Sequence, residues 1–85
     1  MHRVVTVTAR EGFRLDVEFT DGLRGVVSLK ERLFGPLFAP LRDPALFARA
    51  TVDAFGAVCW PNGADLAPDG LHAQVEQGGG NRPVA

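Results

Sequence analysis

The sequence predicts a single α+β domain, with a small antiparallel sheet covered on one face by a short helix. Three observations favour this class: β-like alternation in the first third, an Asp-Pro helix start near the middle, and turns too short for parallel crossovers. A chain of 85 residues has room for one domain with a small core. We assign the domain to residues 1–72 and predict a flexible Gly-rich tail at 73–85.

The first third predicts an antiparallel meander of three strands. Val5, Val7 and Ala9 alternate with threonines, and an apolar residue occupies every second position from 13 to 19. Asp-Gly at 21–22 then indicates a hairpin. Only a three-residue loop over positions 20–22 keeps the apolar faces matched, and it requires a left-handed glycine at its end.

The middle of the chain predicts short helices. Residues 30–34 could form one helical turn, which Gly35-Pro36 would end, and residues 37–41 follow as an apolar linker. Asp43 can cap a helix whose first position is Pro44. This helix is too short to be stable alone, so it is expected to pack on the sheet. Its inward-facing residues would be Leu46, Phe47 and Ala50.

The last third predicts one or two further strands that complete the sheet. They lie at residues 51–55 and 57–60, on either side of Gly56. A turn at residues 61–63 and a last helical turn at 68–72 follow.

Composition excludes several classes of protein. Hydrophobic residues make up 46% of the chain and charged residues 22%, which argues against disorder throughout. No apolar run approaches the ~20 residues of a membrane-spanning helix, and no secretory leader is recognisable, so a cytoplasmic protein without membrane contact is expected. A net charge of −1 gives no general attraction to nucleic acid, and a single cysteine allows no internal disulfide.

No catalytic constellation stands out, so we predict no enzyme activity, no catalytic residues and no cofactor. Asp16 and Glu18 share a strand face, where cross-strand ion pairs are a better interpretation than a catalytic pair. Cys59 lies beside Trp60 in an apolar strand, which is typical of a small buried residue.

Metal binding is not predicted either. Asp65, Asp69 and His72 have helix-like spacing, but Pro68 interrupts any helix that would carry all three. No second His or Cys cluster completes a coordination sphere, and His2 at the chain terminus is given no role.

The stretch from Trp60 to Asp69 is the most distinctive, and two interpretations stay open. It can be a capped loop with its indole in the core, or a recognition surface. The candidate partner-binding residues of that surface are Trp60, Asn62, Asp65 and Asp69. As an alternative, clustered arginines could bind nucleic acid, the candidates being Arg14, Arg24 and Arg32.

Three motifs resemble a known family. Phe-x-Asp-Gly stands at residues 19–22, Leu-x-Asp-Pro-x-Leu-Phe at 41–47, and Trp-Pro-Asn-Gly-x-Asp-Leu-x-Pro-Asp at 60–69. This pattern resembles the bacterial family of small proteins catalogued as domain of unknown function twenty-four forty-two. The resemblance covers residues 4 to 71, and the Trp-Pro-Asn-Gly-x-Asp stretch is the most specific part.

The resemblance implies a compact α+β domain without a known catalytic activity or cofactor. Family members often form one half of a two-gene pair and are suspected of toxin–antitoxin-like roles. Some carry a helix-turn-helix region after this domain, whereas only a short tail follows here, so autonomous DNA binding is not expected. We therefore predict an interaction module that binds a small protein partner and is antitoxin-like. The alternative is a nucleic-acid-associated regulator. Homodimerisation through an edge strand is also compatible with such a small sheet.

Overall fold

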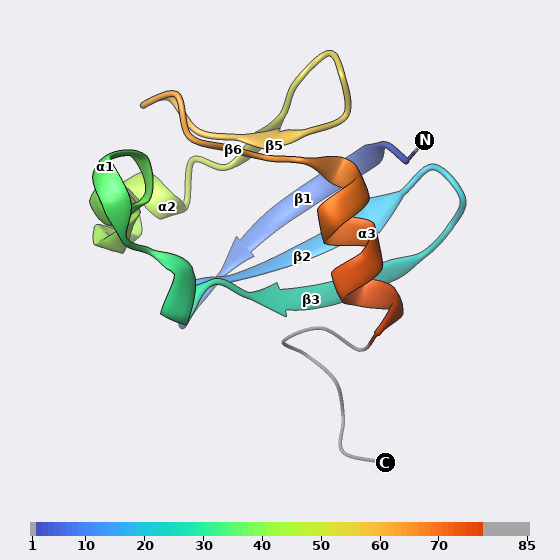
Figure 1. Cartoon of the computed structure of the whole chain (residues 1–85), viewed down its shortest axis with the longest axis horizontal. Coiled ribbons are helices and arrows are strands. Elements are labelled where there is room, and N and C mark those ends of the chain that lie inside the picture. The colour runs from blue at the N-terminus through green and yellow to red at the C-terminus, as the bar shows by residue number, and fades with distance from the viewer. Residues whose placement is uncertain (1, 78–85) are drawn as a thin grey trace.

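The computed structural model describes residues 2–77, which form two small antiparallel sheets and several short helices (Figure 1). The first sheet contains β1 (Val4–Arg10), β2 (Arg14–Phe19) and β3 (Arg24–Ser28), with β2 in the centre. The predicted α+β class and the N-terminal meander are therefore confirmed.

The hairpin between β2 and β3 has the three-residue loop that face matching predicts. Leu15 lies opposite Val27, and the amide of Phe19 donates to the carbonyl of Leu23 over 2.9 Å. Gly22 takes the left-handed conformation that this loop requires, with φ +91°. The apolar residues of β2 therefore all face the core, each at most 1% exposed: Leu15, Val17 and Phe19.

Strand β1 contains an irregularity that alternation alone does not predict. Its register against β2 shifts between Val4 and Thr6, so that Val4 is buried and Val5 is 52% exposed. Val7 and Ala9, beyond the shift, pack partly buried against the core.

The later strands pair with one another instead of extending the first sheet. The second sheet consists of β4 (Thr51–Val52), β5 (Val58–Cys59) and β6 (Asp65–Leu66), in that order. The first two were predicted on either side of Gly56, whereas β6 was not predicted. The short turns in this region return the chain at once to its own preceding strand, which explains the separate sheet.

The segment between the sheets is more helical than expected. A 3-10 turn at Lys30–Arg32 replaces the longer predicted turn, and α1 (Gly35–Phe38) and a second 3-10 turn (Ala39–Arg42) replace the predicted linker. Gly35-Pro36 begins a helix here instead of ending one, because proline fits the first turn, where its missing N–H costs nothing.

Helix α2 (Pro44–Phe47) has the predicted cap, but it does not lie on the face of the sheet as predicted. The Asp43 carboxylate accepts from the amide of Ala45 over 3.0 Å, and the helix ends after one turn. Phe47 is 3% exposed and meets the ring of Phe13 edge-on, with centroids 5.3 Å apart. This helix lies at one end of the first sheet and does not cover its face (Figure 1).

The helix that covers the first sheet is α3 (Pro68–Glu76), which is longer than the predicted last turn (Figure 1). It approaches β3 closely, since a Cβ added at Gly25 would lie 2.7 Å from Val75 Cγ1. The predicted domain boundary at residue 72 thus falls inside this helix, and Val75 packs against the core. The remainder of the predicted tail, residues 78–85, lies outside the described residues.

One apolar core lies between the sheets and the helices, and its cluster includes Val4, Val27, Leu41, Val58 and Leu71. Within residues 2–77, no helix is long and apolar enough to cross a membrane.

The two sheets meet where the chain enters β1. The amide of Val4 donates to the carbonyl of Gly56 over 2.9 Å, and Arg3 Nη2 donates to the carbonyl of Ala54 over 2.6 Å. Gly56 has φ +77°, and a Cβ added there would lie 2.9 Å from the Arg3 Cα. Glycine is therefore required at position 56 for two reasons, its backbone conformation and its close contact with a neighbouring strand.

We predict that Gly56→Ala lowers the free energy of unfolding by more than the ~1–2 kcal/mol that a left-handed alanine costs, because the added methyl group also separates the sheets. Gly22→Ala is the matched control, since Gly22 has φ +91° and no neighbour within 4 Å of its Cβ position. Urea unfolding of both variants measures the difference. Equal losses in the two variants would show that the contact with Arg3 contributes nothing.

Candidate functional site

A buried histidine lies where α3 crosses the first sheet. His72 is 3% exposed. Among the residues that the structure describes, it is the one polar residue that is buried. Its ring meets the ring of Phe19 edge-on, with centroids 4.8 Å apart. Helix α3 turns Leu71 and His72 toward the core, so the imidazole continues the apolar layer.

Two segments that are distant in sequence, and α3 itself, bring polar groups to this imidazole. His72 Nε2 lies 2.7 Å from Asp21 Oδ2 in the β2–β3 loop. The ring of His2 stacks on the ring of His72, with centroids 3.5 Å apart and an angle of 12° between the planes. On α3 itself, Glu76 Oε1 lies 3.3 Å from His72 Nδ1 without forming a hydrogen bond.

The carboxylates favour the charged form of the imidazole. The hydrogen bond that His72 donates to Asp21 raises the pKa of His72 above its ordinary value of 6.5, against the opposing effect of burial, and Glu76 adds to the rise. The pKa of Asp21 is lowered, first by the amide of Leu23 and then by His72. Both shifts favour the ionised pair, a carboxylate at Asp21 and an imidazolium at His72.

The backbone of His2 is held near α3 by one hydrogen bond. Its amide donates to Asp69 Oδ1 over 2.8 Å, which ties the start of the chain to the first turn of α3. His2, Asp21 and His72 each present a ligand atom, and these atoms lie within 4.8 Å of one another. The expectation that no second histidine accompanies His72 is therefore wrong, because His2 lies beside it.

No sequence signal could have placed His2 beside His72. The two residues lie at opposite ends of the chain, and their contact depends on β1 and α3 packing on the same sheet (Figure 1). The helical position of His72 was recognisable in part, since Leu71 and Val75 have the spacing of one helix face.

The predicted partner-binding residues do not form one surface. Trp60 is 4% exposed, and its Nε1 donates to the carbonyl of Phe47 over 3.0 Å. Asn62 binds the carbonyl of Leu37 through Nδ2, over 2.8 Å, and accepts from the amide of Ala64. Trp60 and Asn62 thus bind the backbone of α2 and of α1, which agrees with the capped-loop interpretation.

The two aspartates of the same stretch lie apart from Trp60 and Asn62, in different surroundings. Asp65 is exposed on β6, opposite Cys59, whereas the Asp69 carboxylate accepts a hydrogen bond from the backbone amide of His2. Cys59 itself is partly buried, with Sγ 3.5 Å from Thr51 Oγ1.

The candidate arginines do not form a basic patch with one another. Arg14 binds the carbonyl of Glu11, and Arg32 binds Gln74 Oε1 at the side of α3. Arg24 and Arg14 lie at opposite ends of the outward face of the first sheet, and acidic side chains lie between them.

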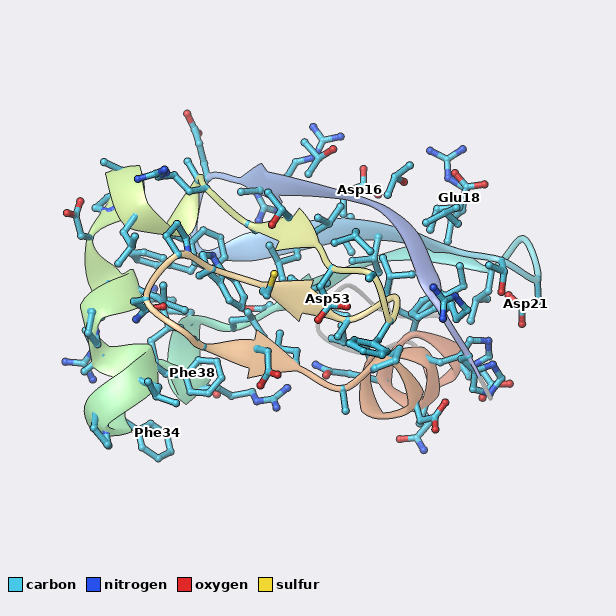
Figure 2. All side chains as sticks on the ribbon, turned by 90° about the horizontal axis from the view of Figure 1, so that it is seen from above. Asp16, Glu18, Asp21, Phe34, Phe38 and Asp53 are labelled. Atoms are coloured by element: carbon cyan, nitrogen blue, oxygen red, sulfur yellow. The ribbon has the colours of Figure 1, made fainter. Side chains whose placement is uncertain are left out.

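Those acidic side chains are Asp16 and Glu18, which point away from α3 (Figure 2). Asp16 pairs with Arg10 over 2.9 Å, and Glu18 Oε1 lies 3.9 Å from Arg24 Nε. The predicted cross-strand ion pairs are therefore confirmed.

An exposed apolar surface lies at the other end of the molecule. Phe34 is 65% exposed and Leu37 48% exposed, close in sequence to the partly buried Phe38, whose ring meets that of the buried Trp60. Figure 2 shows Phe34 pointing outward while Phe38 turns inward. We call Phe34, Pro36, Leu37 and Pro40 the α1 surface. It was missed because residues 37–41 were interpreted as a linker.

The His72 pair predicts a pH-dependent stability. A raised His72 pKa gives stability that is complete below pH 6.5 and is lost as the pH rises through the raised value, whereas the lowered Asp21 pKa gives stability that is present above pH 3.8. In metal-free buffer, Asp21→Asn should therefore lose more stability at about pH 5 than at about pH 8.5. Urea unfolding at both pH values, with Asp65→Asn as control, measures this. A loss independent of pH would contradict the pairing.

A second prediction concerns Trp60. Trp60→Phe keeps an aromatic ring but removes the indole donor from the carbonyl of Phe47, which then accepts only from the amide of Ala50 over 3.3 Å. Unfolding should therefore become easier by about 0.5–1.5 kcal/mol, with the fold retained. Urea unfolding and near-UV circular dichroism measure both effects. Unchanged stability would mean that the indole nitrogen has no structural role.

Comparison with known proteins gives one match. The family model described as "Protein of unknown function (DUF2442)" matches residues 4–77, which span all the elements of the described structure. No curated protein matches the chain. No solved structure matches it either. Because the family model covers most of the sequence, this chain belongs to the family of proteins of unknown function DUF2442.

Proposed function

We propose that this protein is a non-enzymatic interaction module that binds a small protein partner, as the antitoxin-like member of a pair in the bacterial cytoplasm. The observation that carries the proposal is the α1 surface, where two large apolar side chains, Phe34 and Leu37, are 65% and 48% exposed. Exposed aromatic groups beside aliphatic ones are enriched at protein–protein interfaces.

The two side chains belong to one small surface. Phe34 is the extended residue that precedes α1 and Leu37 lies within this one-turn helix, so one short segment presents both apolar side chains. Pro36 and Pro40 are also exposed in this segment, and both limit its backbone freedom. A partner would therefore meet a restricted apolar surface.

Contacts behind the surface hold it in position. The Leu37 carbonyl accepts from Asn62, and the carbonyl of Leu33 accepts from Arg42 Nε over 2.6 Å. Phe38 packs edge-on against Trp60, with centroids 6.4 Å apart. A surface that is ordered before binding loses little conformational entropy when the partner docks. Trp60 and Asn62 thus support the proposed interface from behind.

A hollow elsewhere on the molecule offers little for catalysis. A groove of about 420 Å³ lies between the β1–β2 turn and α2, beside Phe13 and Phe47. The charged side chains in its lining are Arg10 and Glu11, and its lining includes no histidine, cysteine or serine. This composition supports a binding role over an acid–base or nucleophilic one.

The test is capture of the partner by the tagged protein in its native host, followed by measurement of affinity with the purified partner. Phe34→Ser with Leu37→Ser should weaken binding at least tenfold, because both apolar contacts are lost. Phe55→Ser is the matched control, since Phe55 is 78% exposed near Gly56, between β4 and β5. Circular dichroism checks that all variants are folded.

Two outcomes would contradict the proposal. Equal weakening by Phe55→Ser would show non-specific apolar adhesion, and unchanged affinity of the double variant would exclude the α1 surface. Capture is run with and without nuclease, because loss of all bound material after nuclease would favour the nucleic-acid alternative. Arg14, Arg24 and Arg32 do not cluster in the structure, so that alternative has less support.

A further inference from the structure

The chain has two histidines in total, and they meet at one point of the fold. His2 precedes β1 and His72 lies on α3, yet their rings are 3.5 Å apart, with the Asp21 carboxylate beside them. We propose that His2, Asp21 and His72 form a binding site for a divalent transition-metal ion of the zinc type.

The ligand chemistry selects this class of ion. Two imidazole nitrogens and one carboxylate oxygen suit Zn²⁺ and its neighbours, whereas Mg²⁺ and Ca²⁺ prefer an all-oxygen shell. Three protein ligands leave a fourth tetrahedral position for water. Asp21 is half exposed, with 50% of its side chain accessible, so an ion can reach the site from solvent.

The ligand atoms already lie close together, but the His2 ring must turn. Tetrahedral zinc with bonds of about 2.0–2.1 Å holds its ligand atoms roughly 3.3 Å apart. The 2.7 Å contact between His72 Nε2 and Asp21 Oδ2 must open slightly, and the three ligand atoms already lie within 4.8 Å of one another. A metal lies in the plane of the imidazole that binds it, so the stacked His2 ring must also tilt.

The ligands that must move are the ones that are free to move. His2 is partly exposed and precedes the first strand, and Asp21 lies at the tip of the β2–β3 loop (Figure 2). His72 is fixed, because its ring is buried between α3 and Phe19. One rigid ligand and two adjustable ones allow the site to close around an ion at little cost in packing.

The surroundings of His72 also fit a metal ligand. When Nε2 binds a metal, the proton of the neutral ring must be on Nδ1, which is buried and lacks a hydrogen-bond partner. Glu76 Oε1 lies 3.3 Å from that nitrogen and can accept from it. A carboxylate behind a metal-binding imidazole orients the ring and raises its basicity. The amide of His2, bound to Asp69, keeps the backbone of the second histidine beside the site and leaves its ring able to turn.

An ion at this position would join three segments. It would tie the start of β1 and the β2–β3 loop to α3, the helix that covers the first sheet (Figure 1). Binding to the folded state alone raises stability by mass action. The site lies at the opposite end of the molecule from the α1 surface, so this inference is independent of the proposed function (Figure 2).

The test is calorimetric titration of the full chain with zinc chloride, after purification through a C-terminal tag without histidine. We expect one ion per chain, a higher melting temperature with zinc, and ligand-field absorption of bound Co²⁺ typical of tetrahedral coordination. His2→Asn and Asp21→Asn should each weaken zinc binding at least tenfold and remove the increase in melting temperature. These two positions are chosen because neither side chain is part of the buried core.

Matched controls separate this site from other donors. Asp65→Asn removes an exposed carboxylate from β6, and Cys59→Ser removes the single thiol of the chain; both should bind zinc as the unaltered protein does. The proposal is overturned if the folded protein does not bind zinc, or if His2→Asn and Asp21→Asn bind it with unchanged affinity. A loss confined to Cys59→Ser would also overturn it, since it would assign the ion to the thiol.

Discussion

Burial of the inner face of β2 is the constraint on which the other elements depend. Leu15, Val17 and Phe19 are at most 1% exposed in the central strand of the first sheet. The three-residue loop sets the register that keeps these residues on the same side as their partners in β3, and a slip of one residue would turn them to solvent. Helix α3 packs over this sheet (Figure 1), so its position follows from that register.

The same strand brings a polar group into the core. Phe19 contacts the ring of His72, so the imidazole lies at the border between apolar packing and the charged β2–β3 loop. Burying a charge is costly unless it is paired, and the pairing here comes from Asp21, with Glu76 nearby. The arrangement makes the docking of α3 depend on charge as well as on apolar area. It also explains why a helix of nine residues has one defined position on the sheet.

The molecule therefore separates two kinds of chemistry. One end carries imidazoles and carboxylates gathered from distant parts of the sequence, and the other carries exposed apolar side chains on a short helix (Figure 2). Between them, the Trp60 region is structural. The indole of Trp60 and the amide of Asn62 bind backbone carbonyls of α2 and α1, so the Trp60 region supports the surface next to it.

The sequence by itself determined the local features: the alternation in β2, the loop at residues 20–22, the Asp43 cap and the ion pairs of Asp16 and Glu18. Each follows from neighbouring residues or from the pairing of adjacent strands. The family suggested by the resemblance was also confirmed, by the match over residues 4–77. Only the tertiary structure decided that the later strands form a second sheet, that α3 is the covering helix, and that His2 meets His72. These outcomes depend on contacts between residues far apart in the chain, whose free energies are set by burial, and no local pattern records them.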